Sequence, residues 1–333
     1  MIVDTLRSRF EIDRWLDQHP EALAKPIYRP LFIIGMPRAG TTMLLNILRH
    51  DPARRVYWNW EANHEIPPAM GGELQSDPRI AMRIAEIDSA LECGFLDRRH
   101  HVEQGDEPAE CVFPMARDFK SYIWLVTTQV PKYFEWLLNE ADMEAAYRHH
   151  RRSLQLMQTN APGNWTLKWP THAAWTDALL KVYPDARFVV THRDPVKPIG
   201  STCSAVRHAQ AFNNDGIDPN YIGYETSTLV ARMAENMMRT RDANPHVPFH
   251  DLHYKALVAD PIRAIRSIYD FLGEHLSPAV EARMQQEVDE QNASRKVHGP
   301  HVYNLCDYGL SRVGMNTMFR EYVDRFGIAR EAD

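Results

Sequence analysis

The chain has no uninterrupted apolar segment long enough to cross a lipid bilayer. A transmembrane helix needs about 20 predominantly apolar residues. The longest apolar runs here, LFIIG and ARFVVTH, have the length of buried strands. The first residues, MIVDTLRSRFEIDRWLDQHP, are charged throughout and lack the apolar centre of a signal peptide. We therefore predict no membrane span and a cytoplasmic location.

Cysteines are few, and basic residues are not in excess. The four cysteines, Cys93, Cys111, Cys203 and Cys306, form no CxxC pair, which argues against a zinc ribbon or a disulfide framework. The formal net charge of −6 argues against a nucleic-acid partner, although it leaves room for a local basic site. With 44% apolar residues, the 333-residue chain has the composition of a globular protein with a substantial core.

Apolar runs and helical periodicities alternate along the chain in the order typical of an α/β fold. Strands are predicted at residues 31–34, 164–170, 186–192 and 247–254. Helices are predicted at residues 4–19, 41–50, 171–184, 195–209, 226–243 and 261–273, with a last one at the end of the chain. Because helices separate the strands, we predict a parallel sheet flanked by helices.

Three segments fall outside this alternation. Residues 51–72 have loop composition, residues 78–160 show mainly helical patterns, and residues 292–310 are irregular. No repeat or linker divides the chain. We therefore predict a single domain, 1–333, with an N-terminal helical extension (1–30), a helical insertion and an irregular C-terminal segment.

A glycine-bracketed loop, GMPRAGTT, follows the first strand and runs from Gly35 to Thr42. Such a strand-to-helix turn presents backbone N–H groups and the positive end of a helix dipole, which favours phosphate binding. A nucleoside triphosphatase would carry lysine in place of Thr41. The strand ARFVVTH also ends without a magnesium-binding aspartate, so triphosphate hydrolysis is not expected.

Three segments resemble landmarks of the sulfotransferases that use 3′-phosphoadenosine 5′-phosphosulfate (PAPS). IIGMPRAGTTMLLNILRHDP resembles their 5′-phosphosulfate loop, FVVTHRDPVKPIGSTCS their second signature, and HYKALVADPIRAIRSIYDFLG their third landmark. The loop is most similar to that of a bacterial branch related to tyrosylprotein sulfotransferases. The resemblance implies a P-loop-type α/β fold and an enzyme that converts PAPS to adenosine 3′,5′-bisphosphate.

The resemblance also implies which residues hold the two ends of PAPS. The 5′-phosphosulfate is assigned to Pro37, Arg38, Ala39, Gly40, Thr41 and Thr42. Ala39 replaces the more usual serine, which removes a hydroxyl but leaves the backbone donors. The 3′-phosphate is assigned to Arg193 and Ser201. Arg295 and Lys296 resemble a basic segment that related enzymes close over this phosphate, although an exposed polar loop explains them equally well.

Arg193 has a second interpretation from the residues alone. A guanidinium at a strand end can grip a phosphate bidentately, but it can also pair with a nearby carboxylate. In that case Ser201 is only a small helical residue. Asp194 and Pro195 are typical of the N-cap and the first residue of the next helix.

Sulfuryl transfer requires stabilisation of the leaving phosphate and an acceptor for a proton. Arg38 and Lys168 supply cations at the expected strand ends, so no metal is expected. As the base, the resemblance favours Glu61, whose aromatic neighbours would raise its pKa. His64 and His172 are the alternatives.

The sulfate acceptor is expected to be a hydroxyl of a small molecule or a carbohydrate. It would bind between residues 56–70 and residues 90–135, a part of the insertion rich in aromatic side chains, which are equally explained as its core. The identity of the acceptor and the oligomeric state stay open.

Two rival functions remain. The first, a degenerate P-loop kinase, would need ATP and magnesium, and the absent loop lysine argues against it. The second is a non-catalytic PAPS-binding module. The presence of Arg38, Lys168, Arg193, Ser201 and Glu61 argues against that function.

Overall fold

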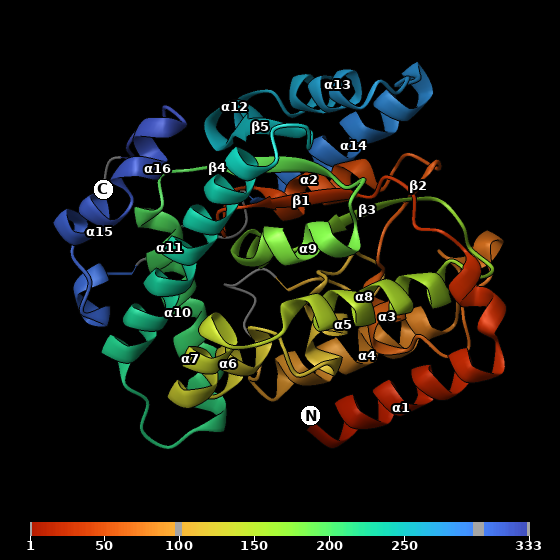
Figure 1. Ribbon diagram of the computed structural model, residues 1–333, viewed down its shortest axis with the longest axis horizontal. Coiled ribbons are helices and arrows are strands. Elements are labelled where there is room, and N and C mark those ends of the chain that lie inside the picture. The colour runs from red at the N-terminus through yellow and green to blue at the C-terminus, as the bar shows by residue number, and fades with distance from the viewer. Residues whose placement is uncertain (1, 97–101, 296–302, 332–333) are drawn as a thin grey trace.

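The computed structural model describes residues 2–96, 102–295 and 303–331, and its helices surround a five-stranded sheet (Figure 1). The strands are β1 (Leu31–Gly35), β2 (Arg54–Arg55), β3 (Asn164–Lys168), β4 (Arg187–His192) and β5 (Phe249–His253). Their order is β2-β3-β1-β4-β5, and all neighbours are parallel. The predicted α/β fold with a parallel sheet flanked by helices is confirmed.

Helices make up most of the remaining described chain. They are α1 (Ile2–Gln18), α2 (Thr41–Leu48), α3 (Asn59–Asn63), α4 (Arg79–Glu92), α5 (Val112–Arg117), α6 (Ile123–Thr127), α7 (Pro131–Asn139), α8 (Met143–Met157), α9 (Thr176–Val182), α10 (Val196–Asn213), α11 (Pro219–Ala243), α12 (Tyr254–Ala259), α13 (Pro261–Leu272), α14 (Pro278–Arg295), α15 (Arg312–Met318) and α16 (Arg320–Arg325). Within the described ranges, none is both long and apolar enough to cross a membrane.

Strand β1 lies between β3 and β4 in the middle of the sheet, and all its residues are buried. Leu31 and Ile33 belong to a core that includes residues of α2, α13 and α14. Phe32 and Ile34 belong to a second core that includes residues of α8 to α11. Figure 1 shows these two groups of helices on opposite sides of the sheet. Helices on both faces explain why the strand is a continuous apolar run rather than an alternating one.

The predicted loop 51–72 is partly regular, since it contains β2 and α3. Strand β2 consists of two arginines, so it has no apolar run from which a strand could be predicted. Both arginines are buried because carboxylates neutralise them: Arg54 pairs with Glu274, and Arg55 pairs with Glu61. Tertiary ion pairs thus stabilise an edge strand whose composition resembles a loop.

Some predicted helix boundaries were wrong. The helix expected at 171–184 begins as a 3₁₀ segment, Pro170–Trp175, before α9. The helix expected at the end of the chain is two short ones, α15 and α16. The segment predicted as irregular, 292–310, is more regular than expected, because α14 reaches Arg295 and Leu305–Tyr308 form a 3₁₀ turn.

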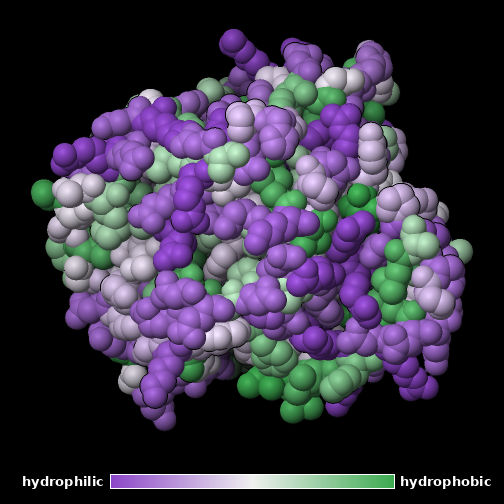
Figure 2. All heavy atoms as spheres, viewed as in Figure 1, coloured by the Kyte–Doolittle hydropathy of each residue, from purple (hydrophilic) through white to green (hydrophobic). Residues whose placement is uncertain are grey.

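Helix α1 is amphipathic and leaves part of its apolar surface uncovered. Figure 2 shows a mostly hydrophilic face with a hydrophobic group at its lower edge, over the start of α1. The exposed apolar residues of this helix are Ile2, Val3, Leu6 and Phe10. Ile12 and Leu16 are buried in the core, so the second half of α1 anchors the N-terminal extension.

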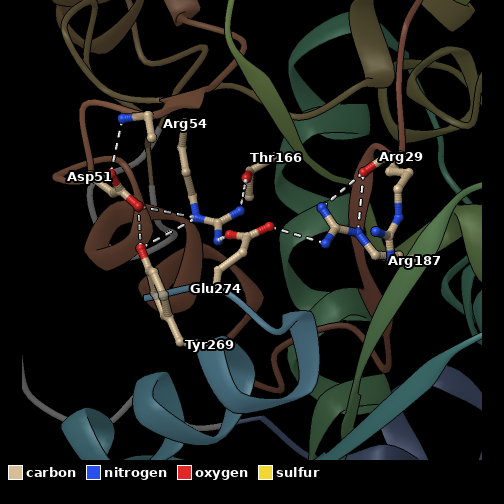
Figure 3. Close-up of polar contacts among 8 residues, drawn as sticks. Arg29, Asp51, Arg54, Thr166, Arg187, Tyr269 and Glu274 are labelled. Atoms are coloured by element: carbon tan, nitrogen blue, oxygen red, sulfur yellow. Dashed lines mark hydrogen bonds and ion pairs between the residues drawn. The ribbon is translucent and has the colours of Figure 1, made fainter. Parts of the chain in front are cut away.

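A buried polar network closes the end of the sheet where β4 begins (Figure 3). Arg54 donates to Thr166 Oγ1 of β3 at 3.4 Å and pairs with Glu274, just beyond α13. Arg187, the first residue of β4, donates from Nη1 to the other Glu274 oxygen at 3.0 Å and from Nη2 to the Arg29 carbonyl at 3.0 Å. One carboxylate therefore bridges two arginine side chains that are only 1% and 7% exposed.

We expect Glu274→Ala to destabilise the protein by roughly 3 kcal/mol, because it removes the carboxylate that two buried guanidinium groups share. Urea unfolding measures the loss. Glu281→Ala is the control, since it removes an equally direct ion pair, with Arg266, whose side chain is 59% exposed. That variant should lose less than about 1 kcal/mol. Equal losses would show that burial does not determine the strength of the bridge.

Candidate active site

The carboxyl ends of three neighbouring strands bring the predicted site residues to one edge of the sheet. Gly35 at the end of β1 is in register with Thr191 of β4, and Lys168 at the end of β3 is in register with Ile33. Arg193 follows directly after β4. The glycine loop, Lys168 and Arg193 therefore share the edge at which open parallel sheets bind ligands.

The two loop glycines have different physical roles. Gly35 has φ +129°, and a Cβ at this position would lie 2.3 Å from the Thr191 carbonyl oxygen, so it allows β1 and β4 to approach closely. Gly40 has φ +86° and is the N-cap of α2, which begins at Thr41. The loop therefore needs one glycine for strand packing and one for the left-handed turn into the helix.

Arg38, between the two glycines, has an exposed side chain and a left-handed backbone with φ +57°. Its carbonyl oxygen accepts a hydrogen bond from Arg193 Nη1 at 2.6 Å, which ties the loop to the end of β4. Partial desolvation, and then the like charge of Arg193, lower the pKa of the Arg38 guanidinium. Tyr254, Tyr303 and Glu110 act on the same group in the opposite direction.

Lys168 has no exposed side-chain surface, and three acceptors surround its ammonium group. Nζ donates to Thr42 Oγ1 at 3.2 Å and to one carboxylate oxygen each of Glu103 and Glu110 at 2.8 Å. Burial alone would lower the pKa of Lys168, but Glu103 and then Glu110 outweigh it and hold the pKa above its usual value. The lysine is therefore a permanent cation beside the first turn of α2.

Arg193 holds a carboxylate, as its second interpretation requires. Its Nε and Nη2 donate to the two oxygens of Glu331 at 2.7 and 2.9 Å, and its guanidinium stacks 4.1 Å above the Tyr254 ring. This parallel pair of hydrogen bonds is also the geometry in which arginine binds phosphate. The Arg193 guanidinium is therefore oriented to bind an anion, and in this structure the anion is the carboxylate of Glu331.

The sequence predicted that Asp194 is the N-cap of the following helix, and this prediction was wrong by one residue. Helix α10 begins at Val196, and Pro195 is at the cap position. One Asp194 oxygen accepts from the backbone N–H of Val196 at 3.5 Å and pairs with Arg330 at 3.3 Å, and the other accepts from the backbone N–H of Glu331 at 2.7 Å. Asp194 therefore contacts both the first turn of α10 and the end of the described chain.

The remaining residues assigned to the 3′-phosphate lie on α10 or at the end of α14. Ser201 is half-buried on α10. Next to it, Gly200 is covered by the Tyr303 ring, whose hydroxyl donates to the Lys197 carbonyl at 2.7 Å. Arg295 is the last residue of α14, and Lys296 lies outside the described residues.

Glu61, on α3, lies in a buried ion pair. Its side chain is 1% exposed, and one oxygen accepts from Arg55 Nη2. Burial raises the pKa of Glu61 against the opposing charges of Arg55 and Arg79. Among the described residues, its second oxygen has no hydrogen-bond partner. The charge of Glu61 is thus only partly compensated by hydrogen bonds and ion pairs. Its ion-pair partner is Arg55, and not Arg38 or Lys168.

The two histidines proposed as bases also have partners away from these cations. His64 Nε2 lies 3.0 Å from Glu86 Oε1. His172 is fully buried, and its Nδ1 lies 2.9 Å from the Tyr147 hydroxyl. Burial lowers the pKa of His172 well below its usual range, so its ring is neutral.

One group of potential metal ligands occurs within the part of the chain that the structure describes. The ligand atoms of Cys111, His150 and His172 lie within 4.8 Å of one another in the core. His150 Nδ1 contacts the Tyr183 hydroxyl at 2.7 Å. None of the three residues is exposed, so this group is enclosed in the core.

Five residues around the cations were missed from the sequence. They are Glu103, Glu110, Tyr254, Tyr303 and Glu331. Two signals were available. The segment EQGDEPAE, which contains Glu103 and Glu110, is dense in acidic residues, and Tyr254 belongs to the third landmark quoted above.

Comparison with known proteins gives a family match and similar solved structures. A family model described as the Sulfotransferase family matches residues 30–278. The chain is 26% identical over 257 residues to the omega-hydroxy-beta-dihydromenaquinone-9 sulfotransferase Stf3 of Mycobacterium bovis, and equally to that of Mycobacterium tuberculosis. The match covers 73% of this chain but only 62% of each relative, less than two thirds of their length.

Two solved structures are similar over almost the whole chain. Sulfotransferase STF9 from Mycobacterium avium is 34% identical with a TM-score of 0.89, covering 99% of this chain and 85% of that one. Sulfotransferase STF1 from Mycobacterium tuberculosis H37Rv is 29% identical with a TM-score of 0.78, covering 93% and 81%.

We expect Gly35→Ala to cost at least about 2 kcal/mol of stability, because the new Cβ would overlap the backbone of β4. Thermal unfolding measures the loss. Gly72→Ala serves as the control, since a Cβ there meets nothing within 4 Å. A Gly35→Ala protein as stable as the control would mean that β1 and β4 separate without cost.

Proposed function

This chain belongs to the sulfotransferase family, and on this premise we propose that it is a sulfotransferase enzyme whose sulfuryl donor is PAPS. The acceptor would be a hydroxyl group of a small molecule or a carbohydrate. The observation that carries the proposal is the convergence of a glycine loop, a buried lysine and an oriented arginine on one sheet edge. PAPS has phosphate groups at two separated positions. Lys168 with Arg38 would hold one of them, and Arg193 with Ser201 would hold the other.

The 5′-phosphosulfate would lie at the loop Pro37–Thr42. Backbone N–H groups at the start of α2 favour an anion there. Lys168 would contact the phosphate oxygen that leaves with the nucleotide, since it already donates to Thr42 of this turn. Arg38 would supply the second cation. Positioned cations of this kind stabilise charge that develops in the transition state, and this removes the need for a metal.

The 3′-phosphate would bind at Arg193 and Ser201. Support comes from the bidentate contact of Arg193 with Glu331, because a phosphate offers the same pair of oxygens. The Tyr254 ring stacks against the face of the same guanidinium group. In this proposal the phosphate replaces the Glu331 carboxylate, and Arg193 keeps its orientation throughout.

For the acceptor, the named relative offers a chemical class. Stf3 is named for a hydroxylated dihydromenaquinone, and we propose an alcohol or phenol on an apolar body for this chain. The insertion would form part of the pocket. Among its aromatic residues, Phe95, Phe113, Phe119, Tyr133 and Trp136 are half-buried, and Tyr122, Trp124 and Phe134 are buried. The half-buried rings are the ones that could contact an acceptor. The single-domain organisation and the cytoplasmic location stay predictions.

Calorimetric titration tests the donor. We expect adenosine 3′,5′-bisphosphate to bind without metal, and ATP with magnesium to bind much more weakly. Arg193→Ala should weaken bisphosphate binding roughly ten- to a hundredfold, because charge-assisted hydrogen bonds to phosphate are lost. Arg38→Ala should instead reduce the transfer rate, by about a hundredfold or more. Arg7→Ala, an exposed substitution on α1, is the control. Binding of ATP with magnesium alone would contradict the proposal.

Glu331→Gln tests the exchange at Arg193. The amide loses the negative charge that competes with phosphate, so bisphosphate affinity should rise by roughly three- to tenfold. Glu321→Gln removes an exposed acid of α16 and should leave the affinity unchanged. Unchanged or weaker binding by Glu331→Gln would show that Glu331 does not compete with the phosphate.

A further inference from the structure

The Lys168 ammonium group binds two carboxylates, those of Glu103 and Glu110, to which no role in the reaction has been assigned so far. An ammonium has three N–H donors. Here they are directed at Thr42 and at Glu103 and Glu110, which both lie 2.8 Å away. The lysine therefore lies between the glycine loop and the segment that joins α4 to α5.

Glu110 is the better placed of the two carboxylates. Its side chain is 29% exposed, whereas that of Glu103 is 17% exposed. The Glu110 carboxylate also raises the pKa of the Arg38 guanidinium, against desolvation and the charge of Arg193. Glu110 thus contacts one of the cations assigned to sulfuryl transfer, lies near the other, and keeps a surface that a ligand can reach.

The backbone on both sides of Glu110 is fixed to the sheet and to the loop after β2. Ala109 N–H donates to the Tyr57 carbonyl at 2.6 Å, and Cys111 N–H donates to the Lys168 carbonyl at 2.9 Å. Ala109 and Cys111 are both buried. These two hydrogen bonds hold the Glu110 carboxylate in a defined position, as a group that abstracts a proton requires.

The residues considered earlier as bases are engaged elsewhere. Glu61 is paired with Arg55, His64 with Glu86, and His172 with Tyr147. A base has to reach the hydroxyl that approaches sulfur, and sulfur would lie beside Lys168 and Arg38. Among the described carboxylates, those that contact Lys168 belong to Glu103 and Glu110.

We propose that Glu110 is the catalytic base that takes the proton from the acceptor hydroxyl, an assignment that rests on the proposed function. In the reaction, a bond forms between the acceptor oxygen and sulfur. The bond between sulfur and the 5′-phosphate oxygen breaks, and that oxygen leaves with adenosine 3′,5′-bisphosphate. The acceptor proton ends on a Glu110 oxygen. Lys168 turns from the Glu110 carboxylate to the leaving oxygen, which releases the base when it is needed.

Three matched variants test the assignment: Glu110→Gln, Glu103→Gln and Glu61→Gln, with Glu110→Asp as the conservative variant. Thermal unfolding and bisphosphate titration check the fold and the donor site of each. Transfer of labelled sulfate from PAPS is then measured with 2-naphthol, 1-decanol, 4-nitrophenol and water as acceptors.

Glu110→Gln should lower kcat with 2-naphthol and 1-decanol by roughly a hundredfold or more, and bisphosphate affinity should change by less than about threefold. With 4-nitrophenol, which is already ionised at mildly alkaline pH, the loss should be much smaller. The fall in wild-type rate at acidic pH, where a carboxylate base is protonated, should be absent in Glu110→Gln. Glu110→Asp should recover part of the rate. Glu103→Gln and Glu61→Gln should keep the dependence on the acceptor and on pH.

The assignment is overturned if Glu61→Gln or Glu103→Gln shows this signature while Glu110→Gln does not. An equal loss on all four acceptors would also overturn it, since that result indicates a role in charge or packing. Wild-type protein that neither binds the bisphosphate nor transfers sulfate to any acceptor would refute the proposed function itself. The two failures are therefore distinguishable.

Discussion

Burial of the Lys168 ammonium group organises this edge of the protein. A charge without solvent costs several kcal/mol unless acceptors surround it, so the chain has to bring oxygen atoms to the end of β3. Thr42 comes from the helix after the glycine loop, and Glu103 and Glu110 come from the segment between α4 and α5. The insertion is therefore attached to the sheet by charge as well as by apolar contacts.

The two main cations of the site are neutralised in the same way. Lys168 has two carboxylates of the insertion, and Arg193 has the carboxylate of Glu331. An anionic substrate that binds at Lys168 or Arg193 would replace carboxylate oxygens of the chain with its own phosphate oxygens. The net free energy of such an exchange is a small difference between two large interactions, which permits reversible binding at strongly charged groups.

Much of the fold could be predicted from the sequence because central parallel strands are continuous apolar runs. Strand β2 was missed because it consists of two arginines, whose burial depends on ion pairs with Glu274 and Glu61 rather than on an apolar run. Arg38, Lys168 and Arg193 could be placed at one edge of the sheet because each follows a recognisable strand. The contacts of Glu110 and Glu331 with these cations could not be predicted, because they join segments far apart in the sequence.

The network of Arg54, Glu274 and Arg187 lies at the end of the sheet away from the strand ends that carry the cations. The bridge is therefore separate from the loops that would contact the ligands. Loops at the cation end can differ between relatives without touching the residues that join β2, β4 and α13. A library that varies these loops but keeps Gly35, Lys168 and its acceptors should leave the bridge intact, and its diversity would explore acceptors.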